Sequence, residues 1–398
     1  MSVSSLQERM ELSKRVSLLE PSETLAIAAK AKELQSKGID VVSLSAGEPD
    51  FDTPDFIKEA AAQALLKGAT KYTPATGTLE LREAVVRKFQ RDQGLSFSAD
   101  QIIVSSGAKH SLYNVFTTLI NEGDEVLIPS PYWLSYSAMV TLAGGTSVII
   151  PTTEATQFKL TPETLRKSIT SKTKILVINS PSNPTGAVYT REELQGIVQV
   201  LKDFPRVMIV SDEIYEKLIF DGQKHVSIAT LDSEISVRTI IVNGHSKAYA
   251  MTGWRLGYTA CPNKDMAKAM SSLQSHSTSN PTSFAQAGGV VALDRGDEEA
   301  ARMCKVYEKR RNMFYDLISA IKPLKPFRPQ GAFYLFVNIA DTGISSTELI
   351  QRLLEEAHVA TIPGKPFGSD AHIRMSFATS EAKLEEAARR LSRWFSKL

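Results

Sequence analysis

Lys247 stands at a position in the sequence where its amine could lie beside a ligand that contains a carbonyl group. Lys247 follows the apolar run Thr239–Val242, and Arg255 comes eight residues later. In open α/β sheets, ligands bind at the carboxyl ends of the strands. A lysine there can be partly desolvated and held near a carbonyl, which are the conditions for a Schiff base. Because most lysines are solvated surface charges, the neighbouring motifs must decide its role.

Two polar motifs follow other apolar runs. Asp212 comes after the run Val207–Ser211, and Tyr215 lies three residues further on. An aspartate at a strand end is often a helix cap or an ion-pair partner, but beside a pyridine nitrogen it would keep that nitrogen protonated. Asn183 lies in the segment Asn179–Gly186, which could be a simple turn. The prolines on either side of Asn183 would hold its amide rigidly enough to donate to a ring oxygen.

A turn of small residues forms the third motif. Ser106, Gly107 and Ala108 stand between a β-branched run and a helical pattern. Small residues let an anion approach the free amides at a helix amino end, where the helix dipole favours it. Ser246 and Arg255 could add a hydroxyl and a planar two-pronged cation for a phosphate. The sequence has no P-loop and no G-x-G-x-x-G, which argues against nucleotide and dinucleotide binding.

The elements that must position these motifs alternate along the chain. Seven short β-branched runs predict strands, at Gln101–Ser105, Glu125–Pro129, Thr146–Pro151, Thr173–Asn179, Arg206–Ser211, Arg238–Asn243 and Gly257–Ala260. Helical patterns separate several of them, with helix starts at Thr161-Pro162-Glu163 and at the capping-box pair Thr190 and Glu193. This alternation predicts an α/β fold with a mainly parallel central sheet flanked by helices.

The pattern changes after about residue 290. We expect a long charged helix over Glu298–Ile321, a proline-rich bend over Lys322–Pro329, an apolar strand over Ala332–Val337 and two further helices. The last helix would bury one face, made of Leu384, Ala387, Ala388, Leu391, Phe395 and Leu398. The sequence therefore predicts a large central α/β domain and a smaller α+β domain.

Composition limits the class of protein. The chain has 398 residues, of which 42% are hydrophobic and 23% charged, as is ordinary for a soluble globular protein. A net charge of +2 without blocks of like charge predicts no nucleic-acid partner. Cys261 and Cys304 lie in apolar surroundings without metal-ligand spacing, so we expect buried free thiols and no metal site. Since no run has the length of a transmembrane helix or the apolar core of a signal peptide, we expect a cytoplasmic protein without a membrane partner.

The motifs resemble those of the fold-type I, pyridoxal phosphate (PLP)-dependent aminotransferases of class I. They are most similar to the bacterial aspartate aminotransferases of the branch that includes thermophile enzymes. From about Ser13 to the carboxyl end, the matching segments follow the family order: Ala46–Phe51, Lys71-Tyr72, Ser130–Trp133, Asn179–Gly186, Asp212–Tyr215, Ser246–Tyr258, Gly331–Tyr334 and Arg374–Ser376. The resemblance implies an amino-terminal arm over residues 1–19, a large PLP-binding domain over 47–290 and a small domain made of 20–46 and 291–398.

The resemblance also implies roles in a PLP site. Lys247 would hold the cofactor as a Schiff base, and Asp212 would pair with the pyridine nitrogen. Asn183 and Tyr215 would hydrogen-bond the ring oxygen, while Trp133 would stack on the ring. The phosphate would be held by Ser106, Gly107, Ala108, Ser246, Arg255 and, from the other subunit, Tyr72. The last of these roles implies a homodimer with shared active sites.

The same resemblance implies an amino-acid and a 2-oxo-acid substrate. Arg374 would bind the α-carboxylate as a bidentate pair, with Gly47 and Asn183 adding hydrogen bonds and Trp133 facing the substrate. Lys247, freed from the cofactor, would move the proton from the substrate Cα as general base and then acid. The kinetics would be ping-pong.

A second carboxylate on the substrate would need a further cation. Animal and enteric aspartate aminotransferases use an arginine of the neighbouring subunit, but residues 274–281 contain none here. In the matching branch a lysine serves instead, and Lys109 stands at its position, although it could be an ordinary surface lysine. Lys109 favours a dicarboxylic substrate. Thr24 with Lys109 also resembles the pair in members that accept prephenate, but Thr24 could equally be a helix-start residue.

Two alternatives remain open at this stage. An aromatic or alanine aminotransferase, or another PLP enzyme on the same fold such as a β-lyase or an aminocyclopropane carboxylate synthase, would keep Lys247, Asp212 and Arg374 without needing Lys109. A PLP-binding regulatory protein would carry an added DNA-binding domain. The chain has neither the length nor the basic region for such a domain.

Overall fold

The computed structural model of the chain describes residues 13–19 and 23–398, without the side chains of residues 23–25 and 28. Most of the predicted amino-terminal arm therefore lies outside the described residues, apart from the short helix α2 (Lys14–Ser17). Among the described residues, no helix is long and apolar enough to cross a membrane.

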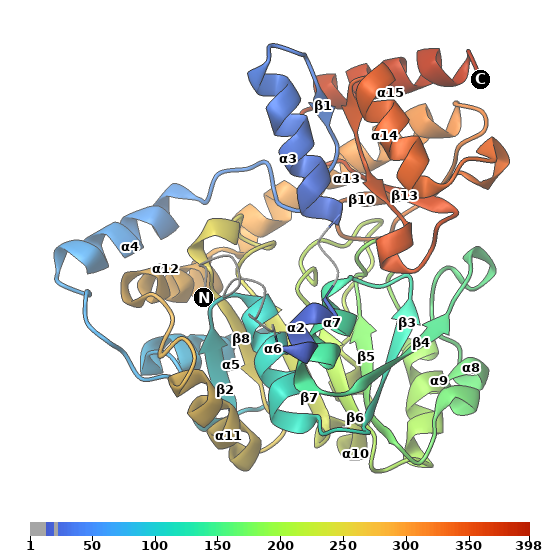
Figure 1. Ribbon diagram of the computed structural model, residues 1–398. Helices are drawn as coiled ribbons and strands as arrows, with labels where there is room; N and C mark the ends of the chain where they lie inside the picture. The colour runs from blue at the N-terminus through green and yellow to red at the C-terminus, as the bar shows by residue number, and fades with distance from the viewer. Residues whose placement is uncertain (1–12, 20–22) are drawn as a thin grey trace, which may run out of the picture.

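A seven-stranded sheet organises the lower part of the molecule in Figure 1. In spatial order its strands are β2 (Ile102–Ser105), β8 (Gly257–Ala260), β7 (Thr239–Gly244), β6 (Met208–Asp212), β5 (Thr173–Asn179), β3 (Glu125–Ser130) and β4 (Thr146–Pro151). β8 is antiparallel to both of its neighbours, and the other neighbouring pairs are parallel. The predicted α/β fold with a mainly parallel sheet is confirmed, and each predicted strand overlaps one of these strands.

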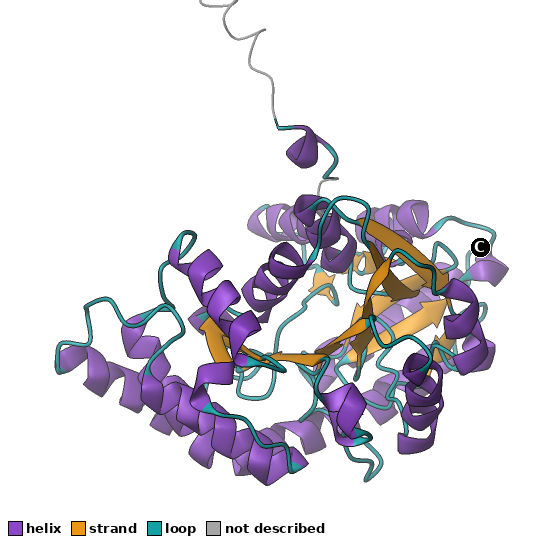
Figure 2. Ribbon diagram, turned by 90° about the horizontal axis from the view of Figure 1, so that it is seen from below, coloured by secondary structure: helices purple, strands orange, loops and turns teal. Residues whose placement is uncertain are grey.

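Helices cover both faces of this sheet, and the strands run between them in Figure 2. One face packs against α6 (Ala108–Leu119), α7 (Ser135–Ala143) and α11 (Lys264–Ser275). The opposite face packs against α5 (Leu79–Gln93), α9 (Arg191–Lys202) and α12 (Ser283–Arg295), and α4 (Asp55–Leu66) lies against α12. Along β2, Ile103 joins the first cluster while Ile102 and Val104 join the second, because successive strand side chains point to opposite faces.

Two helix starts that the sequence predicts are present. The Thr161 side chain accepts from the Thr164 amide at the start of α8 (Pro162–Ser168), where a proline occupies the first turn. Thr190 and Glu193 form the capping box of α9.

A second, antiparallel sheet lies in the upper part of Figure 1, in the order β12 (Ile362–Pro363), β13 (His372–Ser376), β10 (Tyr334–Asn338) and β9 (Lys325–Phe327). The helices around it are α3 (Glu23–Ser36), α13 (Asp297–Ser319), α14 (Ser346–Glu356) and α15 (Glu381–Phe395). β1 (Val42–Ser43) pairs in parallel with β11 (Val359–Ala360), so an early segment of the chain completes this part.

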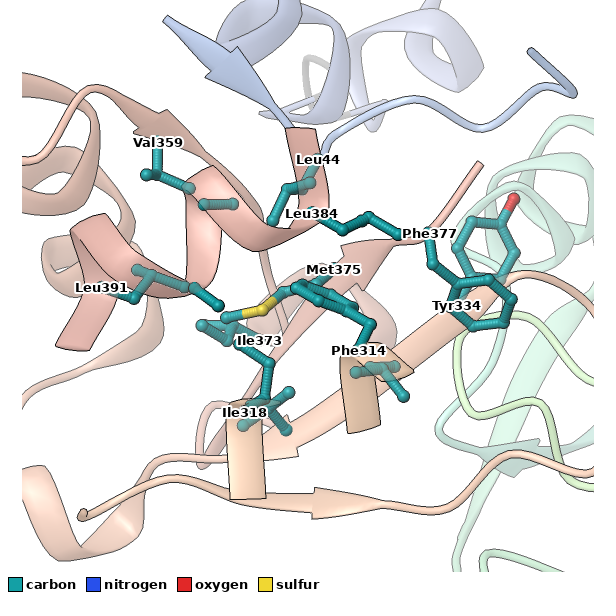
Figure 3. Packing of buried hydrophobic residues seen from close by; sticks show 14 of the residues in the cluster. Leu44, Phe314, Ile318, Tyr334, Val359, Ile373, Met375, Phe377, Leu384 and Leu391 are labelled. Carbon is teal, nitrogen blue, oxygen red and sulfur yellow. The ribbon is translucent and has the colours of Figure 1, made fainter. Parts of the chain in front are cut away.

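The core beside this sheet fixes the strand that carries Arg374. Figure 3 shows Ile373 and Met375 of β13 packed among Leu384 and Leu391 of α15 and Phe314 of α13. Because neighbouring residues of a strand face opposite sides, burying Ile373 and Met375 in this core turns Arg374 to the other face.

Three predictions about this region and the thiols were wrong in detail. Leu398 is 62% exposed because α15 ends at Phe395, so Leu398 does not extend the buried face. The predicted bend contains the strand β9, whose Pro326 is tolerated because β9 is at the edge of its sheet. Cys261 is a buried free thiol as predicted, but Cys304 is only partly buried.

Candidate active site

A cavity of about 390 Å³ lies at the carboxyl ends of the central strands, between the two sheets. Asp212 is the last residue of β6, and Lys247 follows the end of β7 by three residues. Most of the predicted site residues line this cavity: Gly47, Ala108, Lys109, Trp133, Asn183, Asp212, Tyr215, Ser246, Lys247, Arg255 and Arg374. Those from the large sheet meet because its parallel strands present their carboxyl ends at one edge, whereas Gly47 follows β1 and Arg374 belongs to β13 of the small sheet.

The Lys247 side chain reaches into this cavity. Its Nζ donates to the carbonyl oxygen of Gly47 at 2.5 Å. Burial lowers its pKa to about 8, an effect that Glu48 opposes and Arg374 reinforces. A substantial fraction of the amine is therefore neutral near physiological pH, as a nucleophile or a general base requires.

Asp212 is an acid held on two sides. The Tyr136 hydroxyl donates to its Oδ2 at 2.5 Å, and the Ile214 amide donates to its Oδ1 at 3.2 Å. Burial raises the pKa of Asp212 to about 6, and these hydrogen bonds oppose the rise. At neutral pH the group is mainly a carboxylate, yet it has no ion-pair partner among the described residues. A protonated ring nitrogen in the cavity would supply the missing positive charge.

A narrow cradle joins Arg255 to the start of α6. Gly107 has φ +89°, and a Cβ there would lie 2.4 Å from the Nη2 of Arg255. A Cβ on Gly257 would lie 2.1 Å from the Ala108 amide nitrogen. A side chain at Gly107 would therefore displace the guanidinium, and the absence of one at Gly257 lets the start of β8 lie against the amino end of α6.

Some of the hydrogen-bond donors in this cradle already have an acceptor within the protein, and others do not. The Ser106 amide donates to Nδ1 of His110 at 3.2 Å, and the Gly107 amide donates to Ser105 at 2.7 Å. The Ala108 amide and the Ser246 hydroxyl have no hydrogen-bond acceptor within the described part of the chain. Free donors at a helix amino end, beside a guanidinium, suit a phosphate.

Arg374 forms the opposite wall of the cavity and is 3% exposed. Its Nη1 donates to Oδ1 of Asn183 at 2.9 Å and its Nη2 to the Ser45 carbonyl at 3.3 Å. The guanidinium lies 4.3 Å from the ring centroid of Tyr334. No carboxylate pairs with Arg374 among the described residues, so its charge is available to a carboxylate ligand.

Lys109 brings a further cation to the cavity from the first turn of α6. Its Nζ lies 5.0 Å from the ring centroid of Trp133. Partial burial and the neighbouring Arg255 lower its pKa. Within the described chain it has no ion-pair partner either, so the cavity carries an excess of positive charge that suits an anionic ligand.

The family model for class I and II aminotransferases matches residues 39–391 of this chain. The chain belongs to this family. It is 50% identical over 390 residues to the aspartate aminotransferase of Geobacillus stearothermophilus, and the alignment covers 97% of this chain and 99% of that relative. It is 45% identical over 392 residues to a probable aspartate/prephenate aminotransferase of Rickettsia bellii, with 96% and 98% covered.

Solved aminotransferases have the same fold. The crystal structure of the aspartate aminotransferase from Rhizobium meliloti superposes with a TM-score of 0.94 at 41% identity, covering 98% of this chain and 100% of that one. The aspartate aminotransferase from Thermus thermophilus with maleate gives 0.91 at 44% identity, covering 96% and 99%. The family resemblance inferred from the motifs is confirmed.

Some site residues of this aminotransferase were missed by sequence reasoning. Tyr136 and Tyr334 both line the cavity, and Tyr334 shares a 2.8 Å hydrogen bond between hydroxyls with Tyr215. Tyr334 lies in a segment that matches the family, so a signal for it existed. Tyr136 is 76 residues from its partner Asp212, and nothing in the sequence marks that contact. Glu48 and Thr252, which are hydrogen-bonded to each other, also line the cavity.

Four predicted aminotransferase residues are not among those that line the cavity. Ser106 and Gly107 border it through their contacts with Arg255. Tyr72 is 90% exposed, as a residue that serves a second subunit would be. Thr24 belongs to helix α3, and its side chain lies outside the described part of the structure.

Proposed function

We propose that this protein is a PLP-dependent aspartate aminotransferase. It would transfer an amino group between L-aspartate or L-glutamate and 2-oxoglutarate or oxaloacetate by a ping-pong mechanism. The observation that carries the proposal is the cavity that contains Lys247 and Asp212 together with Lys109 and Arg374, two cations without an ion-pair partner among the described residues. The aspartate aminotransferases at 50% and 49% identity support the same substrate class.

The residues present fit PLP. When bound, PLP supplies an aldehyde that takes up the amino group and a ring that accepts electrons from the substrate Cα. Lys247 would hold it covalently, and the Asp212 carboxylate would face its ring nitrogen. The cradle of Gly107 and Arg255, which any side chain at Gly107 would obstruct, suits its phosphate.

The chain's own groups then divide the work. Arg374 would bind the α-carboxylate and so orient the Cα–H bond of the substrate toward Lys247. Because the pKa of Lys247 is about 8, its neutral amine can take the proton from Cα, and the resulting ammonium can return a proton in the next step. Lys109 would bind the distal carboxylate.

The test is the half-reaction of Lys109→Ala with single amino acids. Losing a hydrogen bond to a charged group should weaken turnover of aspartate about 10- to 100-fold. Phenylalanine and alanine have no distal carboxylate, so their rates should not change. Lys268→Ala, on the exposed side of α11, removes a lysine outside the cavity and serves as the control. Undiminished aspartate turnover in Lys109→Ala would favour an aromatic or alanine aminotransferase instead.

Relatives named as aspartate/prephenate aminotransferases support a second acceptor. We extend the proposal to prephenate, with Thr24 and Lys109 as the residues that would bind it. Enzyme loaded with pyridoxamine phosphate should convert prephenate, and Thr24→Ala should lose this activity while keeping 2-oxoglutarate turnover. Failure of the wild-type enzyme to convert prephenate would exclude the extension.

We also propose a homodimer in which Tyr72 reaches the partner's PLP phosphate. The near-complete exposure of Tyr72, together with that of Leu66 (79% exposed) at the end of α4, supports such an interface. Mixing inactive Lys247→Ala with weakened Tyr72→Ala should restore activity, since one of the two sites in a mixed dimer would have both Lys247 and Tyr72.

The separate sheets support the proposed division of the chain into a large domain over 47–290 and a small domain made of 20–46 and 291–398.

A further inference from the structure

One carboxylate ties the two sheets together away from the cavity. Glu154 belongs to the 3₁₀ turn η2 (Glu154–Thr156), which follows β4 of the large sheet. Its Oε1 accepts from Nδ2 of Asn338 at 2.6 Å and contacts Nε2 of His372 at 2.9 Å. These two partners lie opposite each other on β10 and β13. Glu154 therefore binds two residues that face each other on adjacent strands of the small sheet.

The same face of the small sheet leads to Arg374. His372 and Arg374 are two residues apart on β13, so their side chains lie on the same face of the sheet. Phe336 of β10 is the register partner of Arg374 and shares that face. The His372 ring stacks on Phe336, with centroids 4.6 Å apart and planes inclined by 2°. The face thus runs without a break from Glu154 through these two rings to Arg374 in the cavity wall.

Phe158, four residues after Glu154 in the segment that follows β4, adds an apolar contact with the small sheet. It is 7% exposed and meets Phe336 and His372 edge-on, at 5.6 and 5.4 Å between centroids. Phe158 has φ +55° and Gln157 has φ +53°. Gln157 is the exposed left-handed cap that ends η2, whereas for a bulky residue such as Phe158 this conformation is uncommon and needs compensating contacts. The packing of the Phe158 ring on the small sheet provides those contacts.

We propose that Glu154 and Phe158 are positioning residues that set the place of Arg374 relative to Lys247. This inference rests on the proposed function, in which Arg374 binds the substrate carboxylate. Without the two contacts, the sheet face that carries Arg374 loses its outer attachment and keeps the bonds of Arg374 to Asn183 and of Tyr334 to Tyr215. Carboxylate affinity should fall, whereas the groups that hold PLP, which come from the large sheet, should keep their places.

The experiment compares Glu154→Ala and Glu154→Gln with the wild-type enzyme loaded with PLP. Glu154→Ala should raise KM for 2-oxoglutarate and the Kd of maleate about five- to tenfold, with kcat within twofold and PLP affinity unchanged. Glu154→Gln keeps an oxygen that can accept both hydrogen bonds, so it should restore most of the affinity. The control is Glu163→Ala, since Glu163 is an exposed glutamate paired with Lys167 on α8.

Two results would overturn the proposal. One is unchanged KM and maleate affinity in Glu154→Ala, and the other is an equal loss of kcat and PLP affinity, which would indicate general damage. Hydrogen exchange of β10 and β13 in cofactor-free protein gives a readout that needs no turnover. Faster exchange in Glu154→Ala is expected, and unchanged exchange would refute the attachment. If the wild-type enzyme fails to convert aspartate while this exchange still increases, the proposed function fails and the attachment stands.

Discussion

Replacing Tyr136 by Phe removes a single oxygen atom from the support of Asp212. The hydroxyl donates to Oδ2 of Asp212 at 2.5 Å, and Tyr136 and Asp212 are 1% and 3% exposed. The phenylalanine ring can keep the edge-on contact with Trp133, 5.4 Å between centroids. Burial and the Asp212 charge hold the pKa of Tyr136 well above 10, so Tyr136 always donates and Asp212 must accept.

The magnitude follows from that hydrogen bond. A hydrogen bond to a charged group contributes about 1.5–3 kcal/mol, and 1.36 kcal/mol corresponds to one pH unit in a pKa. Because the bond favours the carboxylate, its loss should move the pKa of Asp212 from about 6 to between about 7 and 8. At pH 6.5 the ionised fraction would fall from roughly three quarters to between about a quarter and a few per cent.

The assay is a titration of cofactor-free protein with PLP at several pH values. If PLP binds the carboxylate form, the apparent Kd varies inversely with the ionised fraction. Relative to the wild type, Tyr136→Phe should bind about 3- to 25-fold more weakly at pH 6.5, about 1.3- to 4-fold at pH 7.5 and about equally at pH 9. The ratio to the wild type removes the titration of PLP itself.

A matched control separates this effect from the loss of a buried hydroxyl in general. Tyr189 is 6% exposed, and its hydroxyl accepts from the Leu160 amide at 2.7 Å, but it does not line the cavity. Tyr189→Phe should therefore leave PLP affinity unchanged at each pH. Equal PLP affinity of Tyr136→Phe and wild type at pH 6.5, or a loss that does not vary with pH, would refute the reasoning.

Two further predictions concern the stability and the phosphate cradle of the cofactor-free protein. The pKa of Lys247 in the folded protein, about 8, lies below the value of 10.5 that is usual for a lysine, so the charged form costs stability below pH 8 and the cost disappears as the pH rises to about 10.5. Lys247→Met should therefore raise the free energy of unfolding at pH 7 by about 1–2 kcal/mol, after allowance for water in the cavity, and lose this gain near pH 10.5. Tm measured across this pH range checks it, and a gain in Tm that does not vary with pH would contradict the assignment. Gly107→Ala should weaken PLP binding through the clash with Arg255, whereas Gly123→Ala, at φ +90° with nothing within 4 Å, should cost only the backbone strain of about 1–2 kcal/mol. Thermal unfolding and PLP titration of the two variants check this, and equal PLP affinities would refute the cradle.

Local pattern was enough to predict the large sheet and much of the site. Strands such as β5 and β6 are buried β-branched runs, which the sequence records directly. Lys247, Asp212 and Asn183 follow the ends of such runs, and the carboxyl ends of parallel strands meet at one edge. The sequence therefore determined which elements form, and which polar side chains they bring to the cavity.

Contacts between segments distant in the chain were decided only by the tertiary structure. The hydroxyl of Tyr136 on Asp212 and the bonds of Glu154 to His372 join residues that share no local pattern. β9 forms because β10 offers it an open edge, although its proline predicted a bend. The physical reason is that helix and strand periodicity records burial along one element, whereas the partner of a polar side chain depends on how separate elements pack.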